Sequence, residues 1–353
     1  MSASERSIFG TLHQRVRHLL SFRYRGHVID QQPLPAGGDG SSCECGAHHR
    51  PGNEYSGLTR PLYIVYREGS QGLGSVHMRG FQVATSLVNV GYGGPIRVQS
   101  LESLYRERPT GAIIVALKTA IKDRFAFALR DLMKRNTLLF DVVDGSISGE
   151  VTCLADGFIC ASVSEYEQRT HSGSRAFLVH HAIDTRIELH TPTARLTFSL
   201  GYYGAAANGL YVGDIPEIEV VTYREDAHQE TGAALSDALS TLMTYSHHYA
   251  VRRWNHRDGY KPLTKAFMAA WCGAVVIASR DDAESLAVLG EDYPYLAPSS
   301  AKEDVMNTIS FARETLGGPE WANASNVMEQ LKALSCPIGS AMSLASALAS
   351  FEG

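Results

Sequence analysis

Residues 261–279, which read KPLTKAFMAAWCGAVVIAS, combine a helix signal with a strand signal. Pro262 suits the first turn of a helix, and Gly273 suits the position directly after its last turn. The run from Ala274 to Ala278 is apolar throughout, which is typical of a strand buried on both faces of a parallel sheet. A helix that leads straight into such a strand predicts an α/β fold.

The same alternation of short apolar runs and longer helical patterns extends over most of the chain. Before Thr191 the apolar runs are Leu62–Tyr66, Phe81–Val90, Ile96–Val98, Ala112–Leu117, Leu138–Val143, Gly157–Ala161 and Ala176–Val179. After it, the pattern restarts with Leu196–Leu200, Ile218–Thr222 and a helix over Ala233–Met243. We therefore expect two α/β layers in tandem, over residues 57–193 and 194–353. Ligands should bind at the carboxyl ends of the strands and in a cleft between the layers.

The composition is that of a globular protein of about two domains, given 353 residues and roughly 150 residues per domain. Lysine and arginine total 32 against 37 for aspartate and glutamate, so the net charge of -5 provides no general attraction for nucleic acid. No uninterrupted apolar run reaches about 18 residues, and the N-terminus is charged, which argues against a membrane span and a signal peptide. We expect a cytoplasmic protein.

Residues 1–56 are predicted to form a basic amphipathic helix followed by a long polar loop. Over residues 4–22 apolar side chains recur at helical spacing among several arginines. Such a helix packs on the body of the protein or on a second copy, or it lies on an anionic membrane surface, and the sequence leaves these alternatives open. The loop also holds four potential zinc ligands, whose crowded spacing suits a solvated loop better than a metal site: Cys43, Cys45, His48 and His49.

A glycine-rich loop follows the first predicted strand of each layer. Glycine lets backbone N–H groups approach a ligand at the start of a helix, although a tight turn would need the same residue. The first loop lacks the Gly-x-Gly-x-x-Gly order of a dinucleotide-binding loop. The candidate binding residues are Glu68, Gly69, Gly72, Gly74 and His77 in the first loop, and Gly201, Tyr202, Gly204 and Asn208 in the second.

Positive charge is concentrated just before and at the start of the helix predicted over residues 261–271. Lys261 and Lys265 lie four residues apart and share one face near the helix N-terminus, where the helix dipole makes a positive charge unfavourable. An anion would relieve this repulsion, and Arg257 lies close in sequence. We interpret the three residues as a site for a phosphate or diphosphate, against the alternative of a solvated helix end.

The run from Arg257 to Ser279, followed by Leu289–Tyr295, resembles the nucleotide-sugar half of glycosyltransferases with the GT-B architecture. The resemblance extends less specifically to Phe140–Asp144 and Val179–Asp184. It implies two Rossmann-like domains that face each other across a cleft. The second loop and the basic residues would then bind the donor, and the first loop would face the acceptor.

The segment behind the strand of residues 274–278 departs from that family. Many retaining members have a glycine pair followed by glutamate there, and the carboxylate holds the donor ribose. This chain reads RDDAESL over residues 280–286. The candidates for this part of the donor site are Asp282, Glu284 and Ser285, with backbone groups as the alternative.

Three residues at the ends of predicted strands are candidates for the chemical step. Asp144 and Asp184 occupy the position where catalytic carboxylates gather in α/β folds, although aspartate also caps helices and forms turns. His181, next to His180, could accept a proton or bind a sugar hydroxyl, or it could be a satisfied histidine at a strand end.

These features predict a metal-independent glycosyltransferase that moves a sugar from a nucleotide-activated donor to a glycan or a small-molecule acceptor. No cofactor is expected, because the nucleotide sugar is itself the substrate. One alternative keeps the fold and makes the chain an epimerase or hydrolase, with His181 and Asp144 transferring protons. Another is a non-catalytic subunit that binds a nucleotide sugar. A nicotinamide dehydrogenase ranks last, because the dinucleotide fingerprint is missing.

Overall fold

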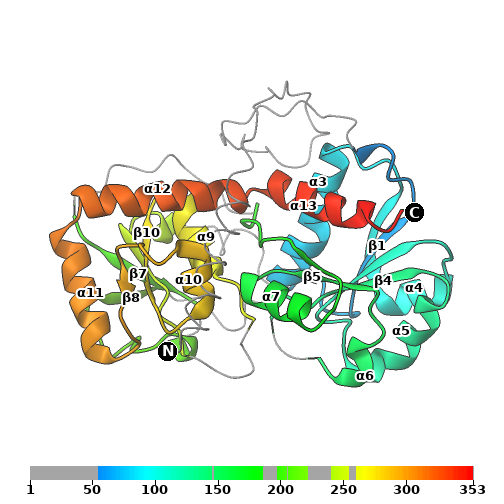
Figure 1. Cartoon of the computed structure of the whole chain (residues 1–353), viewed down its shortest axis with the longest axis horizontal. Helices are drawn as coiled ribbons and strands as arrows, with labels where there is room; N and C mark the ends of the chain where they lie inside the picture. Colours follow the sequence, from blue (N-terminus) through cyan, green and yellow to red (C-terminus); the bar gives the residue numbers. More distant parts are fainter. Residues whose placement is uncertain are drawn as a thin grey trace.

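The computed structural model describes residues 55–144, 147–185, 197–204, 206–221, 240–253 and 260–352. These residues form two parallel β-sheets, which lie side by side with helices packed around each (Figure 1). The predictions for residues 1–54, including the basic helix and the four potential zinc ligands, and the prediction for Arg257 lie outside the described residues.

The first sheet has six parallel strands in the order β2-β1-β3-β4-β5-β6. Its central strand β3 is buried over its whole length, as both faces of a parallel sheet are covered by helices. The strands are β1 (Leu62–Tyr66), β2 (Ile96–Ser100), β3 (Ile113–Leu117), β4 (Thr137–Asp141), β5 (Gly157–Cys160) and β6 (Ala176–Leu178).

The second sheet has five parallel strands in the order β11-β10-β9-β7-β8. Its strands are β7 (Leu200–Tyr203), β8 (Ile218–Val221), β9 (His247–Tyr249), β10 (Val275–Ser279) and β11 (Leu296–Ala297). In each sheet the chain leaves the first strand for a neighbour on one side and then continues on the other side. This creates a topological switch point between β1 and β3 and another between β7 and β9, where α/β folds bind ligands.

Two helix ends show the start and stop signals that the residue types predict. Ser162 caps α7 by accepting a hydrogen bond from the N–H of Glu165, and Gly273 ends α9 with a φ of 64°. The helical segments of the first sheet are α2 (Gly74–Val76), η2 (His77–Gln82), α3 (Val83–Asn89), α4 (Leu101–Glu107), η3 (Asp123–Phe125), α5 (Ala126–Met133), α6 (Gly149–Thr152) and α7 (Val163–His171). Those that follow are η4 (Ala206–Asn208), α9 (Thr264–Trp271), α10 (Ala283–Leu289), α11 (Lys302–Glu314), α12 (Pro319–Leu334) and α13 (Pro337–Ala349).

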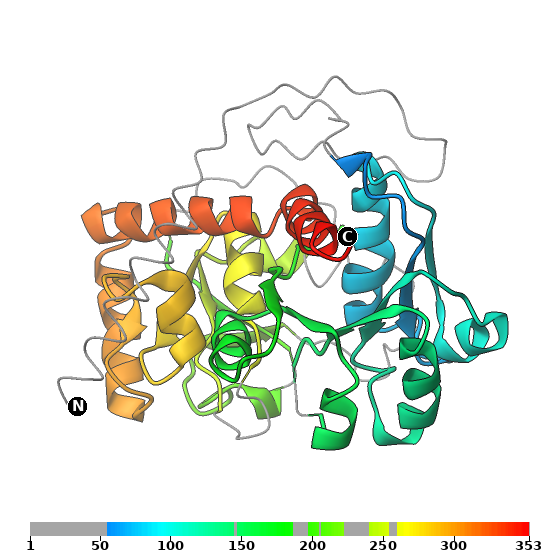
Figure 2. The ribbon, with the colours of Figure 1, turned by 45° about the vertical axis from the view of Figure 1, so that its right-hand side comes forward.

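The chain passes between the two sheets twice. The first passage follows β6, and the second lies between α12, which packs on α9, and α13, which packs on α3 beside the first sheet (Figures 1 and 2). Leu344, Leu348 and Phe351 belong to the same hydrophobic cluster as Leu62 and Ile64. The C-terminal helix α13 therefore belongs to the core of the first sheet. The predicted boundary between the two domains at residue 193 stays a prediction.

Three of the predicted elements differ in the structure, and two strands were not predicted. The helix expected over residues 261–271 begins at Thr264, so Pro262 and Lys261 precede its first turn and Lys261 shares no helix face with Lys265. Phe81–Val90 is helical rather than extended, because Val83, Leu87 and Val90 recur at helical spacing and are all buried on one side. The strand expected over residues 196–200 begins at Leu200 and runs to Tyr203. β9 and β11, of three and two residues, were not predicted as strands.

Among the described residues, no single helix has the length and apolar composition of a membrane span; α12 and α13 would meet both criteria together, but they meet at a bend of 54°.

Candidate functional site

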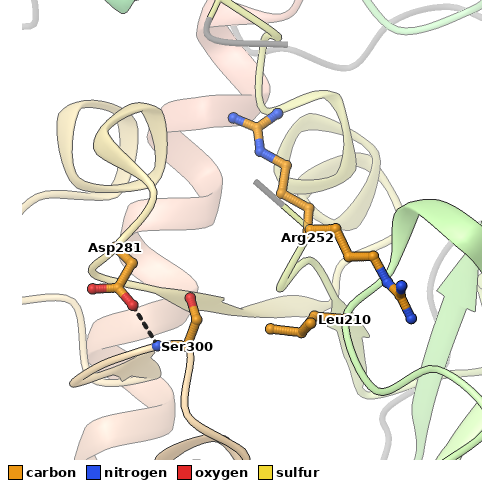
Figure 3. Close-up of a pocket in the computed structure, with 5 residues that line it drawn as sticks. Leu210, Arg252, Asp281 and Ser300 are labelled. Atoms are coloured by element: carbon orange, nitrogen blue, oxygen red, sulfur yellow. Dashed lines mark hydrogen bonds between the residues drawn. The ribbon is translucent and has the colours of Figure 1, made fainter. Parts of the chain in front are cut away.

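A cavity of about 530 Å³ opens at the carboxyl ends of the second sheet. Figure 3 shows Asp281 bonded to Ser300 on one side of it, with Leu210 and Arg252 on the other. Two backbone hydrogen bonds join the loop after β7 to the segment after β9, from Leu210 N to Val251 O and from Arg253 N to Asn208 O. The cavity therefore lies at the β7/β9 switch point, where the topology predicts a ligand.

Arg252 is held in place by two acceptors. Its guanidinium makes a two-pronged ion pair with Asp282, with Nε–Oδ2 and Nη2–Oδ1 distances of 2.8 Å, and Nη1 donates to the carbonyl of Lys261 at 2.9 Å. Asp282 also caps α10, since it accepts hydrogen bonds from the N–H of Glu284 and the hydroxyl of Ser285. Asp282 and Ser285 thus meet near the cavity, where they orient an arginine.

The ammonium group of Lys265 is close enough to this arginine for the two charges to interact. Its Nζ sits 4.8 Å from the centre of the Tyr202 ring, and a Cβ at Gly204 would come within 3.3 Å of it. Gly204 has a φ of 125°, so a side chain there would be both strained and crowded. Burial, together with the nearby charges of Lys261 and Arg252, lowers the pKa of Lys265 to about 8. Lys261 and Arg252 thus repel the charge of Lys265, and the binding of an anion by these residues stays a prediction.

The remaining residues of the second loop are structural in their described contacts. Gly201 lies inside β7, and a Cβ there would come within 2.5 Å of the Tyr245 ring, so packing alone requires glycine. Tyr202 is buried beneath Lys265. Asn208 contributes its backbone carbonyl, which joins the two loops at the cavity. Donor roles for these residues stay predictions.

Glu284 is engaged away from the cavity, on the first domain. Its carboxylate accepts hydrogen bonds from the N–H groups of Val163 and Ser164 and from the Ser164 hydroxyl, at 2.8–3.1 Å. It therefore caps the N-terminus of α7 from the other sheet. Burial raises the pKa of Glu284 to about 7, although the hydrogen bonds from the three donors lower it in part. Sequence offers no signal for this contact, because the partners are 120 residues apart or more.

The first glycine-rich loop lies at the switch point of the first sheet. Thr119, which follows β3, accepts hydrogen bonds from Arg67 N and from the hydroxyl of Ser70. The N–H of Glu68 donates to Glu102 Oε2 at 3.0 Å. Gly69 has a φ of 80° and needs glycine for its backbone conformation. Gly72 lies in the turn, and Gly74 begins the helix that carries His77.

The structure brings together several candidates at this edge of the first sheet. His77 Nε2 lies 3.7 Å from Asp184 Oδ1; the His77 side chain is 25% exposed and that of Asp184 is 8% exposed. Asp144 forms an ion pair with Lys118, at 2.6 Å from Nζ to Oδ1. His77 is thus the more accessible partner of a histidine–carboxylate pair, which sequence analysis did not foresee.

His181 is buried in this region, and the neighbouring His180 is partly buried. Burial and the charge of Arg79 lower the pKa of His180 to about 4 and that of His181 to about 3. Both rings are therefore neutral near pH 7, and a base this weak accepts protons poorly. A neutral imidazole can still hydrogen-bond to a hydroxyl group, which was the second role considered for His181.

Several residues of the site were missed by sequence reasoning. Arg252 and Arg253 directly follow the apolar residues Tyr249–Val251. Two basic residues after a short apolar run were the local signal for an anion site at the end of a strand. Lys118 directly follows β3 in the same way. No group of three or more His, Cys, Asp or Glu side chains in the described parts of the chain is arranged to hold a metal ion.

No protein-family model and no curated protein matches the sequence. Solved structures do match the fold. HepE from Anabaena, in complex with UDP and glucose, has 11% identity and a TM-score of 0.56, with 82% of this chain and 99% of that chain covered. Sucrose-phosphate synthase from Thermosynechococcus elongatus has 11% identity and a TM-score of 0.55, covering 83% and 99%. A glycosyltransferase from Rickettsia africae has 7% identity and a TM-score of 0.55, covering 83% and 98%.

At these identities the likeness establishes the fold. The chain has two Rossmann-like domains in the GT-B arrangement, as the resemblance of the second half implied.

Proposed function

We propose that this protein is a glycosyltransferase that uses a nucleotide-activated sugar. The observation that carries the proposal is the basic cavity at the β7/β9 switch point, bordered by Arg252 and Arg253 with Lys265 beside Arg252. Solved structures of the same fold contain UDP or UDP-glucose. A nucleoside diphosphate has the charge that would offset the repulsion among these cations.

The basic residues would stabilise the leaving group. As the bond between the anomeric carbon and the diphosphate breaks, negative charge builds on the diphosphate, and Arg252 and Lys265 are positioned near the cavity to neutralise it. Lys261 and Arg257 are proposed for the same role on sequence grounds. Loss of one preorganised contact of this kind typically lowers the rate about 10²–10³-fold. With this charge supplied by side chains, we expect turnover without a divalent metal.

On the acceptor side, His77 is the proposed proton acceptor, oriented by Asp184. The acceptor oxygen forms a bond to the anomeric carbon, the nucleoside diphosphate departs with the electron pair, and the hydroxyl proton passes to the His77 ring. His77 suits this role better than His181, because His181 is buried and its pKa is lowered to about 3. Asp144, paired with Lys118, is proposed to bind the acceptor or the transferred sugar.

The proposal is tested by thermal unfolding with a panel of nucleoside mono- and diphosphates and their sugars. A ligand at 100 times its Kd adds about 2.7 kcal/mol to the free energy of unfolding, which is a measurable shift in melting temperature. We expect a shift with at least one nucleoside diphosphate, and release of that diphosphate from its sugar in the presence of an acceptor. No shift with any member of the panel would refute the proposal.

Product analysis separates the alternatives. Transfer to an added acceptor identifies a transferase, whereas release of free sugar or a changed sugar without an acceptor identifies a hydrolase or an epimerase. A thermal shift without turnover of any nucleotide sugar identifies a binding subunit.

A further inference from the structure

Gln82 spans the two residues that flank Asp184. Its side-chain Nε2 donates to the carbonyl of Ile183 at 2.7 Å. Its Oε1 accepts hydrogen bonds from the N–H of Thr185 at 2.9 Å and from the Thr185 hydroxyl at 3.0 Å. Gln82 is 5% exposed, so these bonds are shielded from water. The amide therefore fixes the backbone immediately before and after the carboxylate that faces His77.

The helix that carries Gln82 has an unusual turn. Residues His77–Gln82 form a π-helix between α2 and α3. In an α-helix, at about 100° per residue, residues five apart would point about 140° away from each other. The i→i+5 hydrogen bonding of a π-helix brings such residues close to one face, and π-turns occur frequently at functional sites. The wide turn explains how His77 and Gln82 both reach Ile183–Thr185.

Other side chains hold the same passage between the sheets, but at different points. The buried Arg79 donates from Nη1 to the carbonyls of Val179 and His180, and Ser340 donates to the His180 carbonyl. These contacts secure the start of the passage. Among the side-chain hydrogen bonds described for this passage, those that bracket Asp184 come from Gln82.

We propose that Gln82 is a positioning residue, which sets the Asp184 carboxylate against His77 for the transfer step. The inference rests on the proposed function and adds a residue to it. Gln82 acts through the backbone of Ile183 and Thr185 and touches no substrate. The π-turn is the feature that makes this arrangement available to two residues of one helix.

The test compares Gln82→Met with Thr85→Val in the full chain. Methionine keeps the length of the Gln82 side chain and removes all three hydrogen bonds. Thr85→Val is the control, because Thr85 is exposed on the next helix and, among its described partners, its hydroxyl donates only to the carbonyl of Phe81. We expect Gln82→Met to lower kcat about 10- to 100-fold with the donor KM within about twofold of wild type, because the donor is proposed to bind at the second sheet. Hydrogen exchange over residues 179–185 should also accelerate in Gln82→Met and not in Thr85→Val.

A second comparison excludes a merely structural role. If Gln82 acts through Asp184, Gln82→Met should lower kcat little further in an Asp184→Asn background, because contacting residues that act as one unit are not additive. Full additivity, unchanged exchange, or faster exchange with unchanged kcat overturns the inference. If Gln82→Met does not fold, Thr185→Val replaces it in both experiments, because this variant removes one of the three hydrogen bonds. A wild-type protein that turns over no nucleotide sugar refutes the proposed function instead, before any variant is compared.

Discussion

Replacing Lys265 with methionine should stabilise the ligand-free protein and weaken its binding of a nucleoside diphosphate. The two effects have one cause. In the folded protein Lys265 is half-buried beside two other cations, which lowers its pKa from 10.5 to about 8. Each pKa unit corresponds to about 1.4 kcal/mol, so the folded state loses at most about 3 kcal/mol by holding this charge near pH 7.

Two terms reduce the expected gain. Water that reaches the partly exposed ammonium screens the repulsion, and the contact with the Tyr202 ring, worth about 0.5–1 kcal/mol, is lost in the variant. We therefore expect Lys265→Met to raise the free energy of unfolding by about 1–2 kcal/mol at pH 7. UDP, as the representative diphosphate, should bind about 10- to 100-fold more weakly, because a charged hydrogen bond contributes about 1.5–3 kcal/mol.

The pH dependence of unfolding gives a second test of whether Lys265→Met stabilises the ligand-free protein. Because the pKa of Lys265 is lower in the folded state than its ordinary value, the unfolded chain holds the extra proton between about pH 8 and 10.5. Wild-type stability should therefore rise with pH across this interval relative to the variant, and the advantage of Lys265→Met should disappear by about pH 10.5.

Urea unfolding with and without UDP measures both effects. Lys332→Met is the matched control, since Lys332 is also half-buried and lies 5.5 Å from the ring of Trp271, at the opposite end of α9 from Lys265. The control should gain no stability and should leave UDP binding unchanged. A Lys265→Met protein that is less stable than wild type, and that binds UDP equally well, would refute the assignment of Lys265 to an anion site.

Three other perturbations have definite expected outcomes. Glu284→Ala should lower the free energy of unfolding by about 1–3 kcal/mol at pH 6, and Ser164→Ala should lower it less. Because the folded-state pKa of Glu284 is about 7 and its ordinary value is 4.5, the loss in Glu284→Ala should shrink as pH rises through 7. Urea titrations that show equal losses at pH 5 and pH 8 would contradict this. Asp141→Ala should lower the free energy of unfolding, measured in urea, by about 3–5 kcal/mol, because it leaves the charge of Arg79 buried without its carboxylate partner. A decrease under about 1 kcal/mol would show that water reaches the pair. Deletion of residues 1–54 should leave the melting temperature within about 3 °C of wild type, since residues 55–352 as described already form extensive hydrophobic clusters around both sheets. Aggregation of the shortened chain would show that part of the N-terminal segment belongs to the core.

The α/β class and the two-layer organisation could be predicted from sequence, because long buried strands and helix ends have local signatures. β1 matches the predicted Leu62–Tyr66 at both ends, and Gly273 ends α9 as expected. β9 lacked such a signature, since three residues with two histidines show no strand pattern. It is a strand because β7 and β10 pair with it on both sides.

The chemical classes in the site were also accessible to sequence. Glycines after the first strand of each layer and two lysines predicted at a helix start are candidate binding residues. Lys265 lies in the first turn of α9 and close to Gly204, whereas Lys261 precedes the helix. Their partners were not accessible, because nothing local relates residues more than about 20 positions apart. The bidentate pair of Arg252 with Asp282 joins residues 30 positions apart, and the contact of His77 with Asp184 joins residues 107 apart.

By itself, the sequence determined most of the helices and buried strands, since hydrophobic periodicity, capping residues and glycine placement act over a few residues. The exceptions are Phe81–Val90, which is helical, and the short strands β9 and β11. Tertiary structure alone decided which side chains meet. Folding brought Glu284 to the N-terminus of α7, returned α13 to the first sheet, and placed Gln82 on both sides of Asp184. The physical reason is that burial removes water as a hydrogen-bond partner, so buried polar groups must bond to other protein groups. The packing of the sheets and helices determines which of those groups lie within reach.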